Sequence, residues 1–427
     1  MRSEARPPRV VETLRRDIAR LAAADLAGRL AGSTGARAAA DWLQRELAAI
    51  GLQPAGSRGF KQPLSVPTTR LLGPARLIIG GRALQHRRDF AELSTHSGSG
   101  AARGPLRMLR AAEPLPETAV AGALLLLADP PPDLDLAATA QAAAALGAQA
   151  LLIAEDAPRW FAKSVHPGNG PIPLLRVQRR LLPELAAKPL ADALLDLPLE
   201  RAARPCANLL ARLPGCSATV APVLVVAHYD HVGDDPGGLR HPGAFDNASG
   251  VALALALARK MAAPGECLPF DLVFTFTTGE ESGLHGVRAL LAADTRFAAA
   301  INLDAIGLAA RDPLLRTAPA DIDDPWIALA ERALRRTGIH PVRVSGRDDA
   351  SALRAAGIAT LGLGEQYHVE DGDPMHTPDD LPQRVHATAL LQTLQALADL
   401  LTDPALPRAL SPRGATPWTP PSPVCCN

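Results

Sequence analysis

Short apolar runs that alternate with helical segments constrain the fold of this chain most, and they fill its second half. The runs that resemble buried strands are 223–227, 270–276, 299–303 and 358–363. Helical segments separate or follow them, at about 248–262, 283–293, 324–337 and 384–402. Parallel strands need long crossover connections, which are usually helices. The alternation therefore predicts an α/β fold with a doubly wound sheet over residues 206–405.

The rest of the chain divides around this sheet. Residues 1–74 carry helical periodicity from about 10 to 50 and are predicted to belong to the same domain. Residues 75–205 are predicted to form a smaller inserted domain, because a strand, a helix and a strand follow one another at 122–154. Residues 406–427 are rich in proline, so we expect a disordered tail.

Composition excludes several classes of partner. Lys+Arg and Asp+Glu both number 44, so the formal net charge is zero and predicts no attraction to nucleic acid or to an anionic membrane surface. No uncharged apolar run reaches the roughly 18 residues of a membrane span. Charged residues interrupt every apolar stretch near the N-terminus, so no signal peptide is expected and a cytoplasmic location is predicted.

The five cysteines form neither a disulfide framework nor a zinc-ribbon pattern, because they are odd in number and irregularly spaced. We expect reduced thiols, as in most cytoplasmic proteins. A bridge between Cys206 and Cys216 stays open for an exported protein.

Ligand-type side chains follow the predicted strands at the point where each strand ends. They comprise His228, Asp230, Glu280, Glu281 and Asp304, together with Asp246 in a turn before a helix and His376 in a later loop. Each alone has an ordinary structural explanation, such as a helix N-cap or a favourable charge at a helix N-terminus. Their convergence on one edge of a sheet, where α/β proteins bind ligands, predicts a functional site.

The charges of this set fit two divalent metal ions. Two Zn²⁺ bring four positive charges, which Asp246, Glu281, Asp304 and a bridging hydroxide would balance. If Asp246 bridges, one metal takes His228 and Asp304 and the other takes Glu281 and His376. Each ion then has four nitrogen and oxygen ligands, as zinc prefers.

Two carboxylates are left for other roles. Asp230, two residues after His228, is placed to accept the second ring N–H of that ligand. Glu280 stands beside a ligand without being one, and we assign it as the general base that moves the proton from a metal-bound water to the leaving amine.

These motifs resemble a known family. The segments Ala227-His228-Tyr229-Asp230-His231, Gly243–Gly250, Thr278-Gly279-Glu280-Glu281, Asn302-Leu303-Asp304 and His376-Thr377-Pro378 are similar to those of the clan MH zinc aminopeptidases, metallopeptidase family twenty-eight. The resemblance implies a three-layer α/β/α fold, two zinc ions per chain and the residue roles given above. It also implies a peptide substrate, whose N-terminal residues are released by hydrolysis. The segment Asp25–Gly35 resembles the opening segment of family members.

The insertion resembles a protease-associated (PA) domain, which implies a role in capping the site or in substrate access. One departure from the family concerns the residue before the final histidine, which is often Tyr and here is Met375. Tyr367 or His368 could replace it in stabilising the oxyanion. Among the remaining histidines, His231, His241, His285 and His386 match no motif role, and Asp348 and Asp349 fit either an N-cap or the substrate site.

Several alternatives keep the same scaffold. A carboxypeptidase stays open, since no carboxylate-binding arginine stands out in the sequence. A glutaminyl-cyclase-like acyl transferase is less favoured, because such relatives use one zinc and five ligands are present here. A non-catalytic binding protein is also less favoured, since the base and every ligand are retained.

Overall fold

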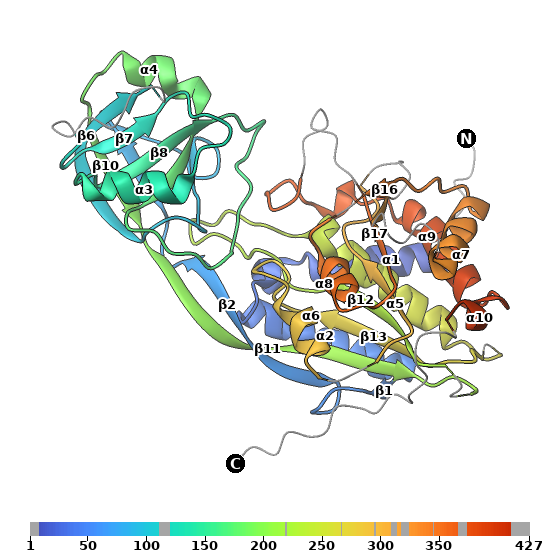
Figure 1. Cartoon of the computed structure of the whole chain (residues 1–427). Coiled ribbons are helices and arrows are strands. Elements are labelled where there is room, and N and C mark those ends of the chain that lie inside the picture. The colour runs from blue at the N-terminus through green and yellow to red at the C-terminus, as the bar shows by residue number, and fades with distance from the viewer. Residues whose placement is uncertain are drawn as a thin grey trace, which may run out of the picture.

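The computed structural model describes residues 8–110, 120–217, 220–265, 267–293, 296–308, 314–316, 324–344, 346–365 and 374–410. Within these residues the chain forms two lobes, each built on its own sheet (Figure 1). The larger lobe carries a nine-stranded sheet of order β1-β11-β13-β12-β14-β17-β15-β16, with β2 paired to β11. The smaller lobe carries an eight-stranded sheet of order β4-β3-β10-β6-β7-β8-β9-β5.

Four parallel strands form the centre of the larger sheet and confirm the four strands predicted from apolar runs. They are β12 (Val223–His228), β13 (Leu272–Thr277), β14 (Ala299–Leu303) and β17 (Thr360–Gly364). Every residue of these strands is buried, which explains why they are continuous apolar runs without alternation. The flanking strands are β1 (Gln53–Pro54), β11 (Leu199–Leu213), β15 (Leu314–Arg316) and β16 (Arg343–Val344).

Helices cover both faces of this sheet, as a doubly wound fold requires. One face packs against α1 (Arg9–Leu21), α2 (Thr34–Ile50), α5 (Gly250–Met261), α7 (Pro325–Arg336) and α9 (Ala387–Leu401), which share one large apolar core. The other face packs against the shorter α6 (His285–Leu291) and α8 (Asp349–Ala355). The helices lie close to the predicted ranges.

The smaller lobe contains the predicted strand–helix–strand unit, and this prediction is confirmed. Strands β7 (Leu124–Leu127) and β8 (Ala150–Glu155) are parallel, with α3 (Leu136–Ala145) between them in the chain. The other elements are β3 (Arg76–Ile79), β4 (Arg82–Ala83), β5 (Phe90–Glu92), β6 (Gly100–Leu109), β9 (Leu174–Gln178), α4 (Leu182–Ala186) and β10 (Asp192–Leu197).

A long two-stranded ribbon joins the lobes (Figure 1). It consists of β2 (Lys61–Leu71) and β11, which pair antiparallel from Lys61–Leu209 to Leu71–Leu199. The chain thus enters and leaves the smaller lobe along this ribbon, and the predicted boundary between residues 205 and 206 falls inside β11. The ribbon tolerates the prolines at 63, 67 and 205 because strands at an edge can dispense with ladder donors.

Three predictions need correction. The predicted start of the Pro-rich tail, residue 406, is too early. Residues Leu406–Leu410 form helix α10, and Leu406 and Leu410 are buried in the main core. The predicted tail beyond residue 410 lies outside the described residues. The expectation of reduced thiols is wrong for one pair, because Cys216 is paired with Cys267, whose Cα lies 5.7 Å away. The bridge considered between Cys206 and Cys216 is therefore wrong too, and Cys206 is a free thiol.

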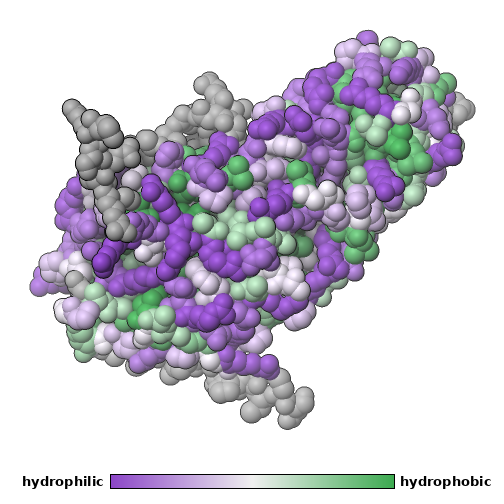
Figure 2. All heavy atoms as spheres, turned by 180° about the vertical axis from the view of Figure 1, so that it is seen from behind, coloured by the Kyte–Doolittle hydropathy of each residue, from purple (hydrophilic) through white to green (hydrophobic). Residues whose placement is uncertain are grey.

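Seen from behind, polar residues spread over the larger lobe, and apolar side chains gather mainly toward the end of the smaller lobe (Figure 2). Among the described residues, no helix has the length and apolar character needed to cross a membrane.

Candidate metal centre

The carboxyl ends of three neighbouring parallel strands meet at one edge of the larger sheet and carry most of the predicted site. His228 is the last residue of β12, Asp304 directly follows β14, and Glu280 and Glu281 come shortly after β13. The strands lie in the order β13-β12-β14, so these side chains converge. The structure brings together all five predicted ligands, His228, Asp246, Glu281, Asp304 and His376.

The five residues divide into two clusters that share Asp246. In the first cluster, His228 Nε2 lies 3.3 Å from Asp246 Oδ1 and 3.4 Å from Asp304 Oδ1. In the second, His376 Nε2 lies 3.0 Å from Asp246 Oδ2 and 2.8 Å from Glu281 Oε2. Asp246 therefore turns one carboxylate oxygen toward each histidine, which is the arrangement a bridging carboxylate needs.

The loop that carries Asp246 is held from the C-terminal side of the chain. The Asp380 carboxylate accepts hydrogen bonds from the backbone N–H of Phe245 at 2.6 Å and of Asp246 at 3.1 Å. Gly243, at the start of the loop, has φ +61°, and a Cβ there would lie 2.5 Å from the His231 ring. Both the backbone conformation and the close approach therefore require glycine at this position.

A fully buried arginine ties the other loops of the site together. The Arg29 guanidinium donates to four carbonyl oxygens, those of Tyr229, Leu21, Pro242 and Gly243, at 2.5–2.8 Å. Arg29 thus links the segment after β12 to the segment that precedes Asp246. Burial lowers the pKa of Arg29 from its ordinary value, although the nearby carboxylates of Asp380 and Asp246 oppose this effect.

The donor set fits divalent cations. His376 Nδ1 lies 3.0 Å from the backbone carbonyl of Lys163, which can only accept, so Nδ1 carries the proton. In the neutral ring the Nε2 lone pair then points at the oxygens of Asp246 and Glu281, and a cation between them is needed to make that contact favourable. Ligands about 2.0–2.1 Å from one tetrahedral zinc lie about 3.3 Å apart, close to the spacings in both clusters.

The electrostatics of the cluster point the same way. Burial alone would lower the pKa of His228, but the carboxylates of Asp230, Asp246 and Asp304 raise it well above its ordinary value. Burial likewise opposes ionisation of Asp246, yet His228 and His376 bring its pKa well below the usual range. The site thus demands positive charge among its carboxylates, which bound metal would supply.

The predicted base and its neighbour lie beside the first cluster. Burial raises the pKa of Glu280 well above its ordinary value, and the surrounding carboxylates add to the effect. The Asp230 carboxylate stands 3.7 Å from His228 Nδ1, longer than a hydrogen bond, and its Oδ1 accepts from the backbone N–H of Glu280 at 3.4 Å. In this arrangement Asp230 contacts both the histidine and the segment that carries Glu280.

His231, which sequence analysis left without a role, lies in the second cluster. Its Nδ1 is 2.8 Å from Glu281 Oε1 and 3.8 Å from Asp246 Oδ2, and its ring is fully buried. The signal that could have found it is its position, three residues after His228 in the same strand-to-loop segment. The other unassigned histidines in the described residues, His241, His285 and His386, belong to neither cluster.

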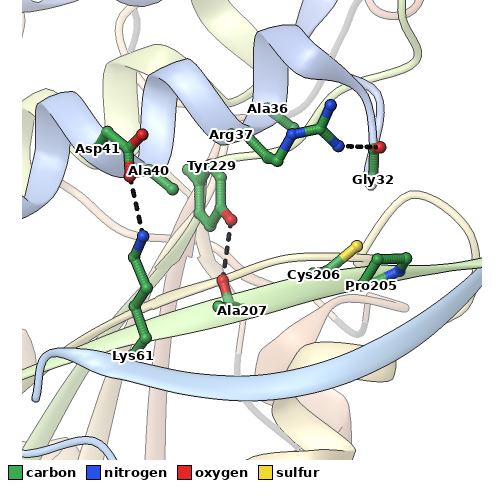
Figure 3. A pocket seen from close by; sticks show the side chains of 10 residues that line it. All are labelled: Gly32, Ala36, Arg37, Ala40, Asp41, Lys61, Pro205, Cys206, Ala207 and Tyr229. Atoms are coloured by element: carbon green, nitrogen blue, oxygen red, sulfur yellow. Dashed lines mark hydrogen bonds and ion pairs between the residues drawn. The ribbon is translucent and has the colours of Figure 1, made fainter. Parts of the chain in front are cut away.

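Tyr229, between His228 and Asp230, lines a pocket between α2 and the ribbon rather than a metal cluster (Figure 3). Its hydroxyl donates to the carbonyl of Ala207 in β11 at 2.8 Å. The Asp41–Lys61 ion pair and the thiol of Cys206 line the same pocket. Tyr229 therefore anchors the ligand-bearing segment to the ribbon.

The remaining candidates take the following places. Asp348 is the N-cap of α8, where its carboxylate accepts from Ser351 N–H, and Asp349 is buried against the Thr277 hydroxyl at 2.5 Å. Burial raises the pKa of Asp349 to about 7. Met375 packs against the main core. Tyr367 and His368 lie outside the described residues.

Two His–carboxylate clusters around one shared aspartate, at the carboxyl edge of an α/β sheet, form a candidate binuclear metal centre of the kind that metallohydrolases use. Comparison with known families gives the finer assignment: residues 208–401, which contain all five ligands, match the description "Peptidase family M28". The match covers somewhat less than half of the chain and agrees with the predicted metallopeptidase family.

Solved structures with the same fold cover nearly the whole chain. An aminopeptidase from Aneurinibacillus sp. strain AM-1 aligns with TM-score 0.68 and 20% identity over 96% of this chain and 97% of that one. BSAP, a zinc aminopeptidase from Bacillus subtilis, aligns with TM-score 0.69 and 20% identity over 93% and 95%. A peptidase M28 precursor from Shewanella amazonensis SB2B aligns with TM-score 0.69 and 21% identity over 96% and 98%. At this identity the likeness shows a shared fold, both lobes included.

Curated relatives match a shorter part. The vacuolar membrane protease of Botryotinia fuckeliana is 29% identical over 168 residues, 37% of this chain and 15% of that protein. Endoplasmic reticulum metallopeptidase 1 of Rattus norvegicus is 31% identical over 126 residues, 29% of this chain and 13% of that protein. The chain therefore matches only about a seventh of the length of these relatives.

Proposed function

We propose that the protein is a dizinc aminopeptidase that hydrolyses the N-terminal residues of peptides. The observation that carries the proposal is the position of Asp246, whose two carboxylate oxygens face two separate histidine–carboxylate clusters. A single-metal site would not need a carboxylate shared in this way. Zinc suits the mixed imidazole and carboxylate donors.

The ligands divide as the geometry suggests. His228 and Asp304 would hold one zinc ion, Glu281 and His376 would hold the other, and Asp246 would bridge them. When bound, the pair of ions supplies a Lewis acid for the scissile carbonyl and lowers the pKa of the attacking water. His231 donates Nδ1–H to Glu281 and fixes the orientation of that carboxylate.

Glu280 acts as the general base. Glu280 lies after β13 and immediately precedes the ligand Glu281 in the chain. Its raised pKa means that this carboxyl group holds a proton more readily than an ordinary glutamate does. It accepts a proton from the attacking water and delivers it to the amine that leaves when the peptide bond breaks. Asp230 holds the backbone N–H of Glu280 and faces His228, so it positions both groups.

Two observations support an exopeptidase of the amino-terminal kind. Solved structures of the same fold include enzymes described as aminopeptidases, from Aneurinibacillus sp. strain AM-1 and Bacillus subtilis. The smaller lobe contains the parallel strands β6 to β9 and helix α3. These elements agree with the PA-like insertion expected from the sequence. We include that domain type in the proposal.

The test is hydrolysis of a panel of aminoacyl-p-nitroanilides by purified protein, with zinc measured on the same sample. We expect cleavage that a chelator abolishes and zinc restores, with about two zinc ions per chain. Two bound ions without cleavage of any N-terminal residue would overturn the aminopeptidase assignment. Failure to bind metal when zinc is supplied would overturn the ligand assignment itself.

A further inference from the structure

One segment of the smaller lobe reaches the metal centre. Residues 156–173 connect β8 to β9 without helix or strand, and within them the Lys163 backbone forms two hydrogen bonds with His376, one to its backbone and one to its ring. The Lys163 N–H donates to the His376 carbonyl at 3.0 Å, and His376 Nδ1–H donates to the Lys163 carbonyl at 3.0 Å. A ligand at the edge of the larger sheet is thus held by the backbone of the other lobe.

This contact decides which nitrogen of His376 can bind metal. Since the Lys163 carbonyl fixes the proton on Nδ1, the Nε2 lone pair is directed at Asp246 Oδ2 and Glu281 Oε2. Hydrogen bonds of this kind set the tautomer and ring orientation of metal-binding histidines. Without the lobe, His376 would keep its place in the chain but lose this partner.

We propose that the smaller lobe is a working part of the metal centre, with Lys163 as a positioning residue that orients His376 and so sets the affinity of the second metal ion. The proposal rests on the metal ligands assigned above. It assigns the lobe a task beyond covering the site, since metal affinity depends on how the lobe is docked.

The Lys163 side chain fixes the segment to the larger lobe. Its Nζ lies 2.9 Å from Asp235 Oδ1 and donates to the carbonyl of Gly233 at 2.7 Å, and the ammonium group is buried. Asp235 and Gly233 belong to the loop that begins at His228. The loop after His228 is itself held by backbone hydrogen bonds to residues 27–29, so the Lys163 side chain uses this loop as an anchor, while its backbone holds His376.

A second buried cation reinforces the same anchor. Arg87, also from the smaller lobe, donates to Asp235 Oδ2 at 2.9 Å and to Glu92 at 2.5 Å. Its carbonyl accepts from the backbone N–H of Phe161, two residues before Lys163. Two cations thus face the two carboxylates, Asp235 and Glu92, so that the buried charges are balanced where the lobes meet.

Apolar contact holds the segment on its other side. Val165 is buried in a small cluster with Leu30 and Val232 of the larger lobe. Its carbonyl accepts from the N–H of Thr69 in the ribbon at 3.0 Å. Polar and apolar contacts on either side of Lys163 therefore leave its backbone little freedom to move away from His376.

The experiment compares zinc binding by the wild-type protein, Lys163→Met and Lys188→Met, titrated in competition with a chromophoric chelator. Lys163→Met removes the buried ammonium group, whereas Lys188→Met removes the same charge from an exposed position in the same lobe. We expect Lys163→Met to weaken one of the two zinc sites about 10–100-fold, the usual cost of disturbing a partner of a metal ligand, and to leave the other site within about threefold. Lys188→Met should bind like wild type.

Two further pairs of variants test whether Lys163 affects zinc binding through His376. In a His376→Ala background, Lys163→Met should have no additional effect on the remaining zinc site, because its partner is gone. If Lys163→Met does not fold, Val165→Ala provides the same test with a milder change. Its matched control is Val177→Ala, which removes the same atoms from the core of the smaller lobe. Only Val165→Ala should weaken the second zinc site.

The outcomes separate this proposal from the proposed function. A folded Lys163→Met protein that binds both zinc ions with wild-type affinity would overturn the positioning role and leave the dizinc site standing. Equal weakening of both sites, or a further loss in the His376→Ala background, would also overturn it. A wild-type chain that binds no zinc would instead remove the metal centre itself.

Discussion

Two neighbouring carboxyl groups, Glu280 and Glu281, experience opposite effects from almost the same surroundings. Burial and nearby carboxylates raise the pKa of Glu280 well above its ordinary value. Burial acts in the same direction on Glu281, but His376 and His231 outweigh it and lower that pKa to about 2. One dipeptide thus provides a carboxyl group suited to proton transfer and a carboxylate that stays charged for a metal, a separation typical of catalytic pairs.

This separation predicts the behaviour of Glu280→Gln. The amide cannot accept a proton, so kcat/KM on an aminoacyl-p-nitroanilide should fall by at least about 10²–10⁴-fold. Zinc content should stay at the wild-type value, because Glu280 belongs to neither ligand cluster. Glu184→Gln, at an exposed position of the smaller lobe, is the control and should retain activity. Undiminished turnover by Glu280→Gln would remove the base assignment.

Sequence spacing indicated the five candidate ligands because each follows a strand or turn that can be predicted from the apolar pattern. It did not reveal His231, whose contact with Glu281 depends on how two loops fold back on each other. It also did not reveal Lys163, which touches His376 across 213 positions of sequence through its backbone. A backbone contact leaves no mark on residue type, so no motif could have indicated it.

At the scale of the elements, the loops of the site depend on one buried residue between α1 and α2. Arg29 donates to four backbone carbonyls, of which that of Gly243 also accepts from the Ala248 N–H. Buried carbonyl groups need donors, and a charged donor makes stronger hydrogen bonds than a neutral one. The segment 24–30 therefore acts as a clamp on the loops that precede Asp246 and follow His228.

Arg29→Met should expose this dependence. The substitution removes the guanidinium donor from four carbonyl oxygens, of which only that of Gly243 keeps a backbone donor, and we expect the free energy of unfolding of the metal-free protein to fall by about 3–5 kcal/mol. Urea denaturation followed by circular dichroism measures the change. Arg37→Met removes an exposed arginine that bonds one carbonyl, that of Gly32, and should change stability by no more than about 0.5 kcal/mol. A loss no larger than the control's would contradict the clamp.

The helices and strands could be predicted where their burial produces a regular pattern of apolar residues in the sequence. The central strands β12, β13, β14 and β17 are buried on both faces and read as apolar runs. The ribbon strands β2 and β11 mix exposed, half-buried and buried residues without a regular period and contain prolines, so their full length and their pairing across the lobes were not recognised. Helix α10 was missed because Pro407 dominates a short segment whose burial is decided by tertiary packing.

For the whole molecule, the two lobes meet at a buried set of charged groups, beside the small apolar cluster of Val165, Leu30 and Val232. Arg87, Lys163, Asp235, Glu92 and His86 surround one another there, and His241 Nε2 lies 3.2 Å from Asp235. Burial lowers the pKa of His241 to about 3, and the nearby cations Lys163 and Arg87 contribute to that effect. His241 is thus neutral in the folded protein at neutral pH.

Acid should therefore destabilise the protein through His241. Since the folded pKa lies below the ordinary value of about 6.5, stability is complete above pH 6.5 and declines as pH falls from there toward 3. The variant His241→Gln keeps a donor for Asp235 but does not titrate. Its free energy of unfolding, measured by urea denaturation of metal-free protein at several pH values, should fall less steeply over this window. His340→Asn, at an exposed position, should follow the wild-type curve, and an equally steep curve for His241→Gln would contradict the prediction.

Metal removal tests the assembly as a whole, because the two clusters draw on the ends of β12, β13 and β14, the turn before α5 and a loop held by the smaller lobe. Without cations, Asp246, Glu281 and Asp304 are packed together at a cost that bound zinc would remove. A metal that binds only the folded state at a hundred times its dissociation constant adds about 2.7 kcal/mol. Chelation should therefore lower the thermal unfolding midpoint, and added zinc should restore it. The variant His228→Ala should show a smaller shift because one ligand is missing. If neither chelator nor zinc changed the thermal unfolding midpoint, these buried carboxylates would be stabilised by the protein alone.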